Sequence, residues 1–208
     1  MTTKMLAVRG CLPALLCALA WSGSVAAQAP QYAATGELLR PADYRDWVYV
    51  TSGLDMFYGP GAPANAAGRP SVFTNVFVTR TAYEEFMRSG TWPDKTMFIL
   101  EVRRAEKAAS IDTGGQSQGA VLTIESAVKD LQRFGANAGS NGWGYFGFGS
   151  PTGLRESSAV LPTNASCYSC HAANTAVDNT FVQFYPTLFE VAERLGTVKT
   201  TYDPNHKL

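Results

Sequence analysis

The chain has 208 residues, 46% of them hydrophobic and 12% aromatic, so it holds ample material for one domain with a packed core. Seventeen basic residues balance seventeen acidic ones, and only 16% of the residues are charged. This balance excludes a nucleic-acid binder that depends on a basic stripe, and the apolar content excludes a disordered chain.

The first 27 residues have the pattern of a secretory signal peptide. Lys4 and Arg9 precede an apolar stretch over residues 11–21, and small residues follow up to Ala27. This order predicts cleavage after Ala27 and export to the periplasm. The apolar run is shorter than the roughly 20 residues that a membrane span needs, which disfavours an uncleaved anchor. We therefore expect residues 28–208 to form a single domain that has no membrane contact after processing.

Strands and short helices alternate irregularly along the remaining chain. Segments rich in β-branched and aromatic residues predict strands at residues 71–79, 96–103 and 143–148. Apolar spacing and capping residues predict helices at residues 41–47, 81–88, 124–134 and 181–195. Residues 59–70, rich in Gly, Pro, Ala and Asn, predict an exposed loop.

Terminating residues refine these predictions. Gly90 and Gly135 stand where two of the helices would end in a left-handed residue, and Thr123 could cap the helix at 124–134. Pro186 fits either the first turn or a kink of the last helix. The pattern predicts an α+β fold with a mainly antiparallel sheet and several short helices. A four-helix bundle is the alternative, but it accommodates the three strand segments poorly.

One motif carries specific chemistry, the run Cys167-Tyr168-Ser169-Cys170-His171. Two thiols at this spacing can form thioethers with both vinyl groups of a haem, and the adjacent histidine can bind the iron. A zinc site, which needs about four ligands, is disfavoured because residues 28–208 contain only two cysteines and two histidines. A thioredoxin-like dithiol would lie near the start of a βαβ unit, not near the chain end. We expect one haem c, bound through Cys167 and Cys170 with His171 as metal ligand, on a C-terminal segment followed by a helix.

The function depends on whether a second side chain binds the iron. Electron-transferring cytochromes c usually supply Met or a second His. All five methionines precede the motif, and His206 lies near the C-terminus. Met56, Met87 and Met97 are possible ligands, although filling the core is the ordinary role of methionine. We therefore predict an open distal position that binds NO, CO or a small nitrogen compound.

Over nearly all of residues 28–208 the chain resembles the cytochrome P-460 and cytochrome c′-beta family. The likeness is most specific at Cys167–His171 and the following residues 178–186, and it includes residues 36–39, 44–47, 73–78, 83–90 and 125–130. It implies a β-rich c-type cytochrome that is commonly a homodimer.

The resemblance also assigns residues around the haem. In hydroxylamine-oxidising members a lysine cross-linked to the haem matches Leu100, and an arginine matches Phe77. The nearest lysine, Lys95, sits in a turn five residues away, on the opposite strand face. The resemblance therefore implies no cross-link and an apolar cap of Phe77 and Leu100, joined by Phe73 or Phe98.

Glu125 matches a distal carboxylate that the oxidising members use as a proton acceptor. An ordinary acidic residue in the first turn of a helix is the alternative explanation. Three functions follow: an NO-binding haem protein, which the apolar cap favours; an enzyme that oxidises hydroxylamine or nitrogen oxides with Glu125 as base; and a simple electron carrier. The expected partners are a small ligand and a redox protein, with no nucleic acid.

Overall fold

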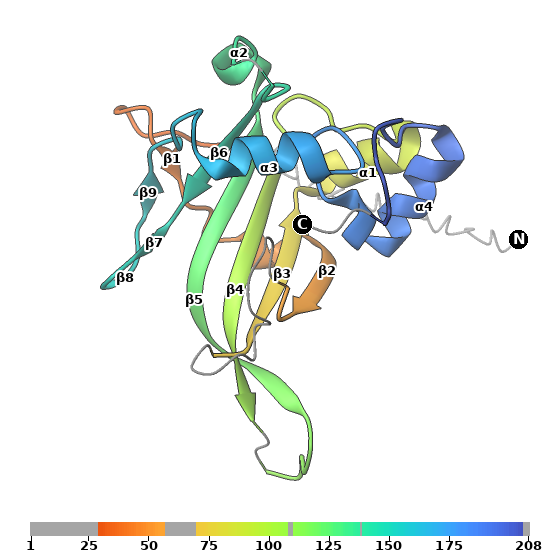
Figure 1. Cartoon of the computed structure of the whole chain (residues 1–208). Helices are drawn as coiled ribbons and strands as arrows, with labels where there is room; N and C mark the ends of the chain where they lie inside the picture. The colour runs from red at the N-terminus through yellow and green to blue at the C-terminus, as the bar shows by residue number, and fades with distance from the viewer. Residues whose placement is uncertain (1–28, 57–69, 108–109, 138, 206–208) are drawn as a thin grey trace, which may run out of the picture.

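The computed structural model describes residues 29–56, 70–107, 110–137 and 139–205. The expected signal peptide, nearly all of the expected loop at 59–70, and His206 lie outside the described residues. Within the described part, strands dominate the first two thirds of the chain and helices the last third (Figure 1). No helix in these ranges is long and apolar enough to cross a membrane.

Five strands form an antiparallel sheet in the order β2-β3-β4-β5-β6. They are β2 (Val48–Leu54), β3 (Val72–Val78), β4 (Met97–Lys107), β5 (Gln116–Lys129) and β6 (Trp143–Gly147). Each strand pairs with the one before it in sequence, and α1 (Arg80–Ser89) is inserted between β3 and β4. The far ends of β4 and β5 continue as a hairpin that projects beyond the other strands (Figure 1). The α+β prediction is confirmed, and the four-helix alternative is wrong.

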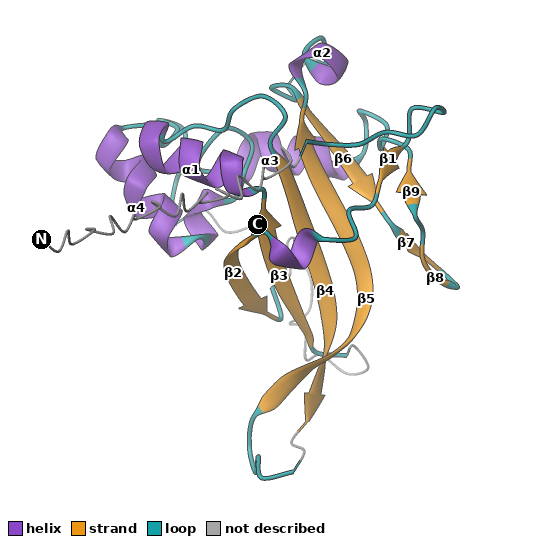
Figure 2. Cartoon of the chain, turned by 180° about the vertical axis from the view of Figure 1, so that it is seen from behind, coloured by secondary structure: helices purple, strands orange, loops and turns teal. Residues whose placement is uncertain are grey.

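Short elements cover the rest of the described chain. They are β1 (Leu38–Leu39), the 3-10 turn η1 (Tyr44–Asp46), α2 (Leu131–Phe134), β7 (Gly149–Ser150), β8 (Gly153–Leu154), β9 (Ser157–Ser158), α3 (Ser166–Asn174), η2 (Val182–Phe184) and α4 (Pro186–Leu195). Helix α3 crosses one face of the sheet, and α1 and α4 pack together at one side (Figure 1). Figure 2 shows the opposite face, where η1 lies against the strands.

Each face of the sheet carries its own apolar core. The core on the α3 side combines strand residues with residues of α1, α3 and α4, among them Val76, Phe98, Tyr145, Tyr168 and Leu188. The other core combines the alternate strand residues with η1 and α2, among them Tyr44, Phe77, Ile99, Phe134 and Phe146. Because successive strand residues point to opposite faces, a strand buried on both sides is apolar at nearly every position.

Several element predictions are confirmed. Strands occur at β3, β4 and β6, α1 ends at Gly90 with φ 71°, and Pro186 is the first residue of α4. The prediction for residues 41–47 reduces to the single 3-10 turn of η1.

The helix predicted at residues 124–134 is wrong. β5 runs to Lys129, and only Leu131–Phe134 is helical, with the Asp130 carboxylate accepting a hydrogen bond from Arg133 N at 3.1 Å. Burial repeats every two residues rather than every 3.6, since the alternate residues Ile124, Ser126 and Val128 are all buried. Gly135 has φ −60° and is not left-handed.

Candidate functional site

Helix α3 carries the cysteine–histidine motif. Cys167, Cys170 and His171 lie three and four positions apart and therefore share one side of the helix. All three line a cavity of about 660 Å³ between α3 and the sheet, and both thiols are free. Cofactor and ligand sites commonly enclose about 300–1,000 Å³, so the cavity has the size of such a site.

The structure fixes the tautomer of His171. Its Nδ1 lies 2.8 Å from the carbonyl oxygen of Asn179, which can only accept a hydrogen bond, so Nδ1 carries the proton. The ring packs against Tyr145 and Phe181, with centroid distances of 4.5 and 4.6 Å. Burial lowers the pKa of His171, which favours the neutral imidazole. Nε2 has no hydrogen-bond partner among the described residues and is therefore available to bind a metal.

The carbonyl that orients His171 belongs to a tight turn. Asp178 and Asn179 both have left-handed backbone angles, with φ 45° and 56°, and Val177 pairs with Thr180 across them. Aspartate and asparagine tolerate this conformation better than other side chains that carry a Cβ. The Asp178 carboxylate binds Lys129 Nζ at 2.6 Å, which anchors the turn to β5. A carbonyl held in this way is the usual outer partner of a metal-binding histidine.

Three neighbouring strands supply the opposite side of the cavity. Val76 on β3 lies opposite Leu100 on β4, and Leu100 lies opposite Glu125 on β5. All three line the cavity, together with Phe98 and Tyr145. This side is therefore largely apolar, with one carboxyl group in it.

Glu125 lines the cavity and its side chain is exposed to solvent there. The neighbouring protein still withdraws the carboxyl group partly from water, and this desolvation raises its pKa above the ordinary value of 4.5. Among the described residues it has no ion-pair partner and makes no hydrogen bond through its side chain. Because Glu125 lies in a strand, the explanation that it is an ordinary first-turn helix residue is wrong.

The structure brings together five of the six predicted site residues and separates the sixth. Cys167, Cys170, His171, Leu100 and Glu125 line the cavity. Phe77 does not: it belongs to the core on the other face, with its ring 5.5 Å from Tyr44 and 5.6 Å from Tyr49. The prediction that Phe77 caps the site is therefore wrong. Val76, one position earlier in β3, occupies the place at the cavity that was expected for Phe77.

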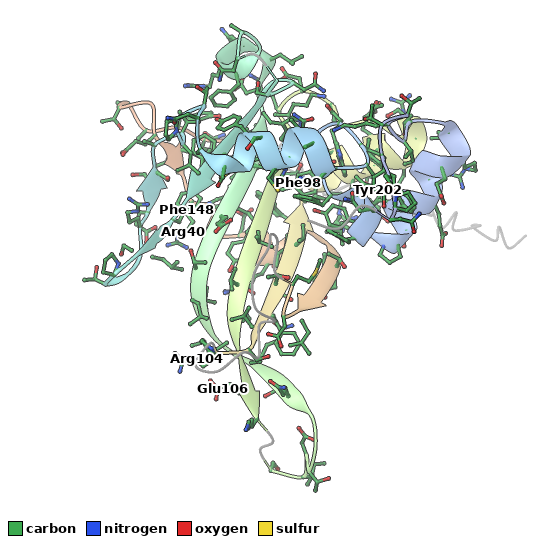
Figure 3. All side chains as sticks on the ribbon, in the orientation of Figure 1. Arg40, Phe98, Arg104, Glu106, Phe148 and Tyr202 are labelled. Atoms are coloured by element: carbon green, nitrogen blue, oxygen red, sulfur yellow. The ribbon has the colours of Figure 1, made fainter. Side chains whose placement is uncertain are left out.

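Lys95 lies away from the cavity, as predicted. It sits in the turn before β4 with φ 66°, and its Nζ pairs with Asp130 at 2.5 Å. No lysine or arginine is among the residues that line the cavity within the described chain. Arg104, at the root of the projecting hairpin, also lies far from α3, whereas Phe98 lies beneath that helix (Figure 3).

Of the three candidate methionine ligands, Met56 alone lines the cavity. Its sulfur rests over Gly53, where a Cβ would come within 2.1 Å of it. Met97 is buried in the core on the other face, and Met87 packs against the core on the α3 side.

Sequence reasoning missed Val76, Phe181 and the carbonyl of Asn179. The Asp178–Asn179 pair is a turn signal, and it could have indicated a tight turn here. No such signal distinguishes Val76 from Phe77, since both are apolar strand residues. Among the described residues, no group of three or more His, Cys, Asp and Glu side chains is placed to hold a metal ion unaided.

The family model for Cytochrome P460 matches residues 41–182. The chain belongs to the cytochrome P460 family. A comparison with curated proteins found no match. Membership in this family implies a c-type haem, and the matched range contains all six predicted site residues.

The cavity of this cytochrome P460 family member fits such a group. Two free thiols and an unpartnered imidazole Nε2 face one space from a single helix. The hydroxyl of Tyr145, also at the cavity, is buried and has no hydrogen-bond partner in the described chain. Leaving such a group unpaired costs about 1–3 kcal/mol, so the site has an unmet requirement that a bound group could satisfy.

Proposed function

We propose that this protein is an exported haem c protein that binds NO or a similar small ligand at an open iron position. The haem would be held through thioethers to Cys167 and Cys170, with His171 Nε2 on the iron. When bound, it supplies an iron that binds diatomic gases and changes oxidation state. The observation that carries the proposal is the cavity itself, where one imidazole faces a largely apolar strand surface.

The chain's own residues make this site selective. Val76, Leu100 and Phe98 present no donor or cation, so polar or charged ligands would lose hydration there without compensation. Leu100 has no amine, so the lysine cross-link that the resemblance associates with oxidising members cannot form at this position. The signal-peptide pattern supports a periplasmic location, and the family resemblance supports a homodimer.

The first experiment identifies the cofactor and its coordination. Mass spectrometry of the exported, processed protein should show the mass of one haem, and Cys167→Ala and Cys170→Ala should each remove one thioether. The ferric spectrum should be high-spin and five-coordinate, and the ferrous protein should bind CO and NO. A polypeptide without a haem would overturn the proposal.

Met56 provides the decisive variant for the open position. If the proposal holds, Met56→Leu keeps the high-spin spectrum of the wild type. A low-spin wild-type spectrum that becomes high-spin in Met56→Leu would identify the thioether as a sixth ligand and would favour an electron carrier instead. Met97→Leu is the matched control, because Met97 lies on the other face of the sheet.

Glu125 favours a second candidate function, the oxidation of hydroxylamine or a related nitrogen compound. Its carboxyl group is the one acidic group at the cavity among the described residues, and desolvation raises its pKa above the ordinary value, as is common for groups that transfer protons in catalysis. Glu125 would accept protons from the bound substrate, while an external one-electron acceptor takes up the electrons. The test is hydroxylamine-dependent reduction of such an acceptor. Turnover that falls at least about 100-fold in Glu125→Gln would establish this activity, and no turnover by the wild type would exclude it.

A further inference from the structure

We propose that Lys199 is a positioning residue for the proximal histidine, and that its charge also favours the reduced state of the bound haem. Lys199 follows α4 and lies outside the residues matched by the family model, which end at 182. The inference rests on the haem attachment proposed above. It concerns the side of His171 that faces away from the ligand cavity.

Lys199 connects the helix that carries His171 to the turn that orients it. Its Nζ donates to Thr175 Oγ1 at 2.8 Å, to the carbonyl of Ala172 at 3.3 Å and to Asn179 Oδ1 at 3.2 Å. Its backbone N–H also donates to the carbonyl of Ala176 at 2.8 Å. A single side chain thus holds both the end of α3 and the left-handed turn.

The two anchored segments act on His171 directly. Thr175 Oγ1 donates to the carbonyl of His171 at 2.6 Å, and Asn179 O accepts the Nδ1 proton at 2.8 Å. Asn179 is held further by its own amide, which donates to the carbonyls of Gly139 and Ser140. Because the turn uses an unfavourable backbone conformation, it depends on such contacts to keep its geometry.

The ammonium of Lys199 forms no ion pair within the described residues. No carboxylate among them lies within 4.0 Å of its Nζ; the carboxylate of Asp178 acts on it from farther away and is itself paired with Lys129. The charge lies close to the imidazole, because Nζ donates to the side chain of Asn179, the residue whose carbonyl accepts the Nδ1 proton of His171. A positive charge beside the proximal ligand disfavours a further positive charge on the iron, so it should raise the reduction potential.

Four variants separate the two roles. Lys199→Met removes the charge and the hydrogen bonds, Lys199→Gln removes the charge but keeps a donor, and Lys199→Arg keeps the charge. Lys95→Met is the matched control, because Lys95 pairs with Asp130 and does not line the cavity. For each purified holoprotein, the ratio of oxidised to reduced haem is measured at one fixed ambient potential. The iron–histidine stretching band and the exchange rate of the Thr180 amide, which donates to Val177 O at 2.8 Å, are recorded as well.

We expect the oxidised-to-reduced ratio to rise about three- to tenfold in Lys199→Met and Lys199→Gln. It should stay within about twofold of the wild type in Lys199→Arg and Lys95→Met. Lys199→Met should also shift the iron–histidine band and accelerate exchange at Thr180. A ratio unchanged in Lys199→Gln would overturn the charge role, and this holds even if Lys199→Met fails to fold. An unchanged band and exchange rate in a folded Lys199→Met would overturn the positioning role. A wild-type protein without haem would instead overturn the proposed function itself.

Discussion

Removing either partner of the ion pair between Lys129 and Asp178 should cost several kilocalories per mole, because both side chains are nearly buried. Lys129 Nζ lies 2.6 Å from Asp178 Oδ2, and the two side chains are only 13% and 11% exposed. Removing one partner of a buried pair costs about 3–5 kcal/mol, since the other charge loses its compensation. Here the remaining charge keeps a partner, because Lys129 also donates to Trp92 O and Asp178 also accepts from Asn141. We therefore expect about 2–4 kcal/mol for each single variant.

Asp178→Asn and Lys129→Met are the suitable substitutions. Asparagine tolerates the left-handed backbone of position 178, so the variant tests the charge and not the turn. The free energy of unfolding is measured by urea denaturation of the holoprotein for both single variants and the double variant. If the pair is coupled, the double variant loses about 2–3 kcal/mol less than the sum of the single losses.

The exposed pair of Arg88 with Glu85 on α1 is the control, and Glu85→Gln should change the free energy of unfolding by no more than about 0.5–1 kcal/mol. Single losses from Asp178→Asn and Lys129→Met that add within about 0.5 kcal/mol would refute the reasoning. In that case the two groups would be solvated independently, and the turn that carries Asn179 would not depend on their attraction.

Three further predictions test the site. Phe77→Ala should lower the free energy of unfolding by about 3–5 kcal/mol and leave the CO association rate unchanged. Leu100→Ala, at the cavity, should raise the CO association rate. A faster rate in Phe77→Ala would contradict the placement of Phe77 and Leu100 on opposite faces of the sheet. His171→Ala should abolish the iron–histidine band, and an identical spectrum would exclude this residue as ligand. Because burial raises the pKa of Glu125, the stability that depends on this group is full below about pH 4.5 and is lost as the pH rises through the raised value. The free energy of unfolding of Glu125→Gln should therefore gain on that of the wild type as the pH rises above about 4.5, and a constant difference would show that folding does not raise the pKa of this carboxyl group.

The sequence predicted the parts of the fold that depend on local pattern. The strand at β3 and the helix α1, ended by Gly90, follow from β-rich composition and from a left-handed glycine. The helix prediction for residues 124–129 failed because Glu, Ala and Lys are good helix formers, yet here they belong to a strand. β5 pairs with β4 on one side and β6 on the other, and this pairing outweighs the local preference.

The grouping of residues at the cavity was predictable where motif spacing defines it and unpredictable where strand phase defines it. That Cys167, Cys170 and His171 face one space follows from their spacing on a helix. Val76 and Phe77 cannot be distinguished in this way, because both faces of β3 are buried and the sequence alternates one apolar residue with another. A shift of one position along a strand moves every side chain to the other face. Assigning Phe77 to the wrong face of β3 is therefore an error of a single residue.

The register between β4 and β5 relates the residue at position 100 to the pKa of Glu125. Leu100 lies directly opposite Glu125, so a lysine at position 100 would place an ammonium beside the carboxylate and stabilise its charged form. With leucine there, burial acts alone and raises the pKa of the carboxyl group. Glu125 can accept a proton only above that raised value, and below it the strand side of the cavity is uncharged. The leucine that, by the family resemblance, stands in the place of a cross-linking lysine is therefore consistent with the proposed binding of an uncharged ligand such as NO, and any proton-accepting role of Glu125 would belong to the pH range above its raised pKa.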